Sequence, residues 1–126
     1  MRPQSLAEVA DLAAYGESFD LSLANFLDEF YARPSQKALE TSPALLAPKF
    51  GDIGRVRDAY LAATAEELAR KFNLVLPRWT EDESRKLHHP WFASTLASLR
   101  AVLIHESPPA FRSRNLFVSE NALSRA

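Results

Sequence analysis

The sequence predicts an all-α fold, a single helical domain that spans residues 1–126. Its 126 residues are 47% apolar and 25% charged, which is the composition of an ordinary globular domain long enough to bury a core. Only three residues are glycine, and this disfavours a hairpin-rich β fold because tight hairpin turns favour glycine. Apolar residues instead recur at the 3.6-residue helical period, and the eight prolines fall between these segments. We therefore expect a bundle of about five helices.

The longest expected helix spans residues 52–72 and should lie at the centre of the bundle. At about 20 residues it would be roughly 30 Å long. Alanines recur along it and would let neighbouring elements approach closely. Asn73 suits the left-handed residue that commonly follows a helix. Most of the expected buried face comes from Ile53, Val56, Tyr60, Leu61, Leu68 and Phe72.

Two helices are expected before the central one. Residues 5–8 have the S-x-x-E form of a capping box, and the short helix that follows should end at Gly16. The second helix has Asp20 or Ser22 as its expected cap. Its apolar face, at helical spacing, consists of Phe19, Leu23, Phe26, Leu27 and Phe30. These phenylalanines predict core packing, with a binding groove as the alternative.

Shorter elements are expected in the C-terminal part. Thr80 begins a T-x-x-E capping box, and one or two helical turns should follow it as far as Leu87. Ser94 is expected to cap a helix over residues 95–105, whose broad apolar surface indicates burial on most sides. Segments 74–76 and 116–118 are apolar and extended, so we expect them to form one short two-stranded pairing.

Charge and composition exclude several classes of protein. The net charge of −1 argues against bulk electrostatic attraction to nucleic acid. Residues 1–54 carry a net charge of −4 and residues 55–126 a net charge of +3, an asymmetry that suits docking of a charged partner. Cysteine is absent, which suits a reducing cytoplasm. No uncharged apolar run approaches the length of a membrane span, and the first residues do not resemble a signal peptide.

Catalytic and metal-binding patterns are not found in the sequence. His88 and His89 are adjacent, so their side chains project to different sides and chelate one ion poorly. No serine lies in a G-x-S-x-G context, and residues 51–54 lack the lysine-threonine pair of a phosphate-binding loop. We therefore expect no metal, no cofactor and no enzymatic activity.

The best candidate for a partner-binding site flanks the expected helix at 95–105. It consists of Trp91, Phe92, Arg112, Arg114 and Phe117. Aromatic residues and arginine are enriched at protein interfaces, and basic residues interleaved with aromatics can also bind single-stranded nucleic acid. Internal packing of the aromatics and internal ion pairing of the arginines is the third interpretation.

Several segments resemble a family of small bacterial proteins. They are ANFLDEFYARP (24–34), AYLAATAEELARKFNLVLPRWTED (59–82), HPWFASTLASLRAVLIHESPPAFRSRNLFV (89–118) and ENALSRA (120–126). Domains of this family occur beside a nucleotidyltransferase-like gene or joined to a helix-turn-helix module, an organisation similar to that of an antitoxin. The resemblance implies no catalytic residues, and the missing helix-turn-helix argues against DNA binding by this chain alone.

The expected function is therefore that of a non-enzymatic cytoplasmic protein. The resemblance implies that it would bind and neutralise a cognate toxin enzyme of nucleotidyltransferase type. The alternative from another class is a nucleic-acid-associated transcriptional regulator, which would bind its promoter in a salt-dependent manner.

Overall fold

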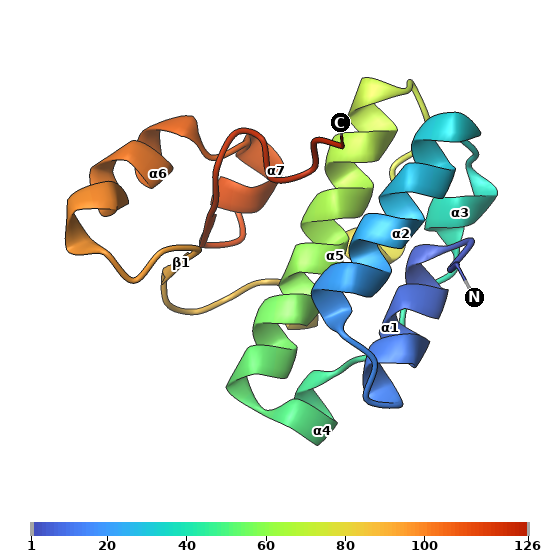
Figure 1. Ribbon diagram of the computed structural model, residues 1–126, viewed down its shortest axis with the longest axis horizontal. Helices are drawn as coiled ribbons and strands as arrows, with labels where there is room; N and C mark the ends of the chain where they lie inside the picture. Colours follow the sequence, from blue (N-terminus) through green and yellow to red (C-terminus); the bar gives the residue numbers. More distant parts are fainter. Residues whose placement is uncertain (1, 126) are drawn as a thin grey trace.

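The computed structural model describes residues 2–125 and confirms a mostly helical fold (Figure 1). The α-helices are α1 (Leu6–Ala14), α2 (Phe19–Ala32), α3 (Lys37–Glu40), α4 (Ala47–Phe50), α5 (Asp52–Lys71), α6 (Arg100–Glu106) and α7 (Pro109–Arg112). The 3-10 turns are η1 (Arg78–Glu81), η2 (Glu83–Arg85) and η3 (Ala97–Leu99), and the strands are β1 (Trp91–Phe92) and β2 (Leu116–Phe117). Among the described residues, no helix is long and apolar enough to cross a membrane.

Local sequence signals set the ends of α1 and α2. The Ser5 hydroxyl accepts a hydrogen bond from the Glu8 amide at 3.1 Å, which is one half of the predicted capping box. Helix α2 begins earlier than predicted, because Ser18 rather than Asp20 or Ser22 caps it by accepting from the Leu21 amide at 3.1 Å. The predicted apolar face of α2 is buried along its whole length, so its phenylalanines are core residues.

Helix α5 is the central element, as predicted, and other elements cover it on several sides (Figure 1). One side packs with α1 and α2 in the larger hydrophobic core, where Leu61 and Leu68 are fully buried. Another side packs with α7 and β2 in a smaller core around Phe111. Tyr60 contacts both cores, and the small side chains of α5 allow this close approach on two sides.

Gly54 marks the tightest approach to α5, and its replacement gives a first prediction. A Cβ added there would lie 2.4 Å from the Leu46 carbonyl oxygen, which is backbone and cannot move aside easily. Gly54→Ala should therefore lower the free energy of unfolding by about 1–3 kcal/mol, although alanine is the better helix former. Urea denaturation measures the change, and Arg70→Ala on the exposed side of the same helix is the control. A variant as stable as the parent protein would refute the packing argument.

The prediction of one short two-stranded pairing named segment 116–118 correctly and its partner wrongly. Strand β2 pairs in parallel with β1, with Trp91 opposite Leu116 and Phe92 opposite Phe117, and not with residues 74–76. The main-chain groups of Val75 are satisfied by a side chain instead: the Val75 amide donates to the Gln36 Oε1 at 2.7 Å, and the Val75 carbonyl accepts from the Gln36 Nε2 at 2.8 Å. A side chain 39 positions away has therefore replaced the strand partner.

Two predicted helical segments are also shorter than expected. The Thr80 hydroxyl donates to the Pro77 carbonyl at 2.7 Å and is not free to cap a helix, so η1 and η2 replace the predicted turns toward Leu87. Ser94 accepts from the Leu96 amide two residues on, which makes a local turn, and the α-helix begins only at Arg100.

Candidate functional site

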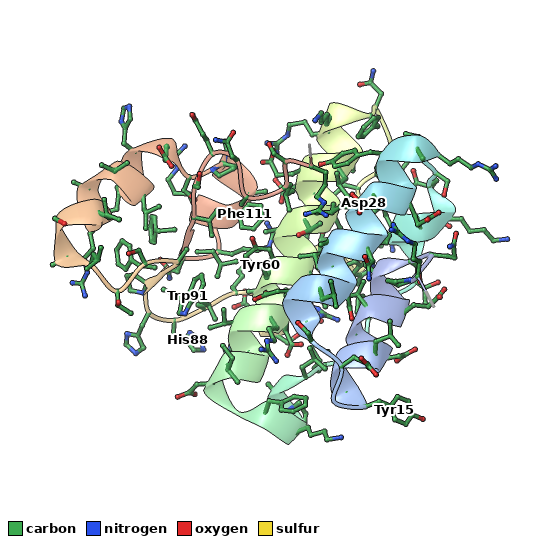
Figure 2. All side chains as sticks on the ribbon, viewed as in Figure 1. Tyr15, Asp28, Tyr60, His88, Trp91 and Phe111 are labelled. Atoms are coloured by element: carbon green, nitrogen blue, oxygen red, sulfur yellow. The ribbon has the colours of Figure 1, made fainter. Side chains whose placement is uncertain are left out.

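The three predicted aromatic residues lie together on the two strands. The rings of Phe92 and Phe117 stack with their centres 5.1 Å apart and their planes at 22°. The Arg100 guanidinium lies over the Phe92 ring, 5.2 Å from its centre. Trp91 is half-buried against the smaller core, next to Phe111 and Tyr60 (Figure 2). These aromatic residues therefore lie on the two strands that flank the segment containing α6.

Arg114 does not lie on the surface, which corrects its assignment as a partner contact. Its side chain is 4% exposed, and its Nη1 lies 2.8 Å from the Glu66 carboxylate of α5. It also donates to the carbonyls of Ala110 at 2.7 Å and Thr80 at 2.9 Å. This side chain joins three separate elements inside the fold, so its role is structural.

Arg112 is exposed and remains available to a partner. Its closest polar contact is a long one, from Nη1 to the Ile104 carbonyl at 3.5 Å. With Arg114 buried, Arg112 is the arginine of the predicted pair that can reach a ligand from the surface. This weakens the nucleic-acid interpretation, which relied on both arginines together.

The segment that connects the two strands carries the most prominent exposed apolar surface of this region. We call residues 95–105 the α6 arm, and Figure 1 shows α6 standing away from the α1, α2 and α5 layer. Leu103 is buried and anchors the arm. The prediction that the other large apolar side chains of the arm are buried is wrong. The exposed fractions are 61% for Leu96, 39% for Leu99, 49% for Val102 and 47% for Ile104.

Charge on the arm is sparse and of one sign. Among residues 95–105 the basic side chains are Arg100 and His105, and there is no acidic side chain. The arm is fixed at its C-terminal end by Ser107, whose hydroxyl donates to the Leu116 carbonyl at 2.9 Å and accepts from the Val118 amide at 3.3 Å. The apolar side chains of the α6 arm are therefore exposed to solvent, while hydrogen bonds to the β2 segment hold the end of the arm in place.

A buried ion pair elsewhere in the fold was not predicted from the sequence. Asp58 is 0% exposed, and its carboxylate accepts from the Leu46 amide at 2.7 Å and the Ala47 amide at 3.1 Å. Arg85 is 3% exposed, with its Nη1 3.9 Å from the Asp58 carboxylate. The signal for such a pair is the acid at position 58, which stands directly before the alanine-rich part of α5.

The ionisation of this pair is dominated by burial. Burial raises the pKa of Asp58, although the amide hydrogen bonds from Leu46 and Ala47 and the nearby arginines oppose the change. Burial likewise lowers the pKa of Arg85 against the attraction of Asp58. Burial is the largest cause of both pKa shifts, and the contacts of the pair join α5 to η2 and to the residues that begin α4.

The histidines show no convergence on a common point. The Nε2 of His88 lies within hydrogen-bonding distance of the Arg55 Nη2, at 3.2 Å. Among residues 2–125, no group of three or more histidine, aspartate or glutamate side chains is arranged to hold a metal ion.

Comparison with known proteins returned no match to a family model, to a curated protein or to a solved structure.

Proposed function

We propose that this chain is a non-enzymatic protein that binds and neutralises a partner enzyme, as an antitoxin does, and that the α6 arm is its docking surface. The observation that supports this is the exposure of four large aliphatic side chains on one short segment, Leu96, Leu99, Val102 and Ile104. Clustered apolar exposure with little charge is typical of surfaces that bind other proteins.

The arrangement of the arm supports a protein partner over nucleic acid. A nucleic-acid surface needs several cations to neutralise phosphates, and the arm offers Arg100, with Arg112 beside its base. The centre of a protein interface is instead depleted of charge and rich in apolar side chains, and arginine is enriched in such interfaces. The proposed partner is a toxin enzyme of the nucleotidyltransferase type, as the resemblance of the sequence implies.

Two charges introduced into the arm should greatly weaken partner binding. The variant Leu99→Asp/Val102→Asp places carboxylates in the apolar surface, and loss of such central contacts weakens binding by about 30-fold or more. The measurement is co-elution with the product of the neighbouring gene, together with relief of the growth inhibition which that product causes.

Exposed apolar residues elsewhere provide the matched control. Leu21 is 62% exposed on α2 and Val75 is 72% exposed after α5, so Leu21→Asp/Val75→Asp adds the same charge outside the arm. This control should bind like the parent protein. Equal loss in both variants would show a nonspecific effect, and failure of the parent protein to bind the neighbouring product would refute the proposed function.

A further inference from the structure

A groove of about 570 Å³ lies where α2, α5, β1 and the segment 118–125 meet. Its lining contains no residue of the α6 arm, so it is separate from the proposed docking surface. Figure 2 places Tyr60 and Trp91 at this junction. The volume is within the range of sites that hold small organic molecules.

The walls of the groove are largely apolar. Helix α2 contributes Leu23 and Leu27, whose side chains are 6% and 3% exposed, so they form part of its base. Helix α5 contributes Val56, and Trp91 and Val118 close the opposite side. An apolar body placed here would lose contact with water over much of its surface, which favours binding.

Two hydrogen-bond donors lie one turn apart on the groove face of α5. The Arg57 guanidinium rests 5.3 Å from the centre of the Phe19 ring, and no carboxylate among residues 2–125 lies within ion-pair distance of it. Among residues 2–125, Tyr60 accepts a hydrogen bond at its main-chain carbonyl, whereas its hydroxyl makes none. Burial raises the pKa of Tyr60 to about 12, with the Asp20 charge adding to this, so the hydroxyl remains protonated and can donate.

The other cation of the groove is already compensated, and the one acid of its lining is exposed to water. Arg125 pairs with Asp28, with Nε and Oδ1 2.9 Å apart. Asp20 is exposed in the first turn of α2, where water and the helix amides stabilise its negative charge. Arg57 is half-buried. Because Arg125 is paired with Asp28, Arg57 is the cation of this groove that lacks a counter-charge among the described residues.

We propose that the groove binds a small organic carboxylate with an aromatic or aliphatic body. The body packs on Leu23, Val56 and Trp91, and the carboxylate accepts hydrogen bonds from Arg57 and Tyr60. A carboxylate fits better than an amine or an alcohol, because both unpartnered groups donate and one of them is a cation. This site does not depend on partner binding by the α6 arm.

Three probes that share one body test the choice of head group. 4-Phenylbutyrate, 4-phenylbutan-1-ol and 4-phenylbutylamine are titrated separately into the uniformly ¹⁵N-labelled full chain, and amide and indole shifts are followed by NMR. The butyrate should bind about tenfold more tightly than the alcohol, the size of one charge-assisted hydrogen bond, and the amine should bind most weakly. The shifted signals should belong to residues 19–27, 53–60, 91 and 118–122.

Variants at Arg57 separate recognition of the head group from packing. Arg57→Gln should bring the butyrate and the alcohol to within about twofold of each other, since the charge-assisted bond is lost, whereas Arg57→Lys should restore most of the preference. Arg78→Gln removes an exposed arginine outside the groove and should change nothing. Ala24→Phe fills the groove from α2 and should weaken all three probes alike.

The opposite results are equally clear. The inference is overturned by equal affinity for the three probes, by absence of any shift at millimolar probe, or by shifts confined to residues 95–105. It is also overturned if Arg57→Gln, folded by its NMR spectrum, keeps the preference for the butyrate.

Discussion

Arg114→Ala should lower the free energy of unfolding by about 3 kcal/mol, a large share of the stability of a small domain. The guanidinium contacts the Glu66 carboxylate and the carbonyls of Ala110 and Thr80, which belong to three different parts of the chain. Alanine leaves both carbonyls without this donor and opens a cavity between α5 and α7. Glu66 retains Arg70 at 2.7 Å, which limits the loss from its own side chain.

The neighbouring arginine is the matched control for this measurement. Arg112 is two residues away and exposed, so Arg112→Ala should change the free energy of unfolding by less than about 0.5 kcal/mol. Arg114→Lys should retain part of the stability, since an ammonium can meet Glu66 but does not reproduce the planar fork of donors. Similar urea midpoints for the two alanine variants would contradict the buried network.

Most of the N-terminal two thirds of the fold could be predicted from the sequence, because periodicity and caps act locally. The spacing of apolar residues placed α2 and α5, and Asn73 adopts the predicted left-handed conformation with φ 56° at the end of α5. The cap of α2 was missed because Ser18, Asp20 and Ser22 are all good capping residues. Which of them caps α2 depends on where Phe19 must enter the core, and that position is set by tertiary packing.

The C-terminal part could not be predicted with the same success, since its elements depend on distant contacts. Segments 74–76 and 116–118 both favour an extended backbone, but only tertiary structure shows that Gln36 occupies the main-chain groups of Val75. Asn115 has φ 63°, and its side chain donates to the Leu87 carbonyl at 2.8 Å, which brings β2 beside β1. Neither contact has a local sequence signal.

For the residues of the candidate site, the sequence misjudged which side chains are buried and which are exposed. The flanks of the α6 arm were proposed as the binding residues, yet Arg114 is internal and Phe92 stacks on Phe117. The arm itself was expected to be core because its apolar residues surround the helix, and such a pattern cannot distinguish burial in the core from exposure to a partner. Only the exposed fractions of Leu96 and Val102 separate these cases.

The second large effect is expected at the buried pair of Asp58 and Arg85. Asp58→Ala should lower the free energy of unfolding by about 3–5 kcal/mol, because Arg85 then carries an uncompensated buried charge. The amides of Leu46 and Ala47 also lose their acceptor, and these amides fix the entry of the chain into α4. Arg85→Met leaves the Asp58 carboxylate without its nearest cation and should cost a similar amount.

The double variant separates the ion pair from the anchoring of the α4 amides. If the two single losses were independent, Asp58→Ala/Arg85→Met would cost about 6–10 kcal/mol and the chain would not fold. We expect a loss of only about 2–5 kcal/mol, since no buried charge remains at this site and the main penalty is the two unsatisfied amides, one of them only partly buried. Arg85 also donates to the Pro43 carbonyl and lies 4.9 Å from the centre of the Trp79 ring, where methionine preserves much of the apolar contact. Urea denaturation of the three variants gives the coupling energy, and additive losses would show that Asp58 and Arg85 act separately.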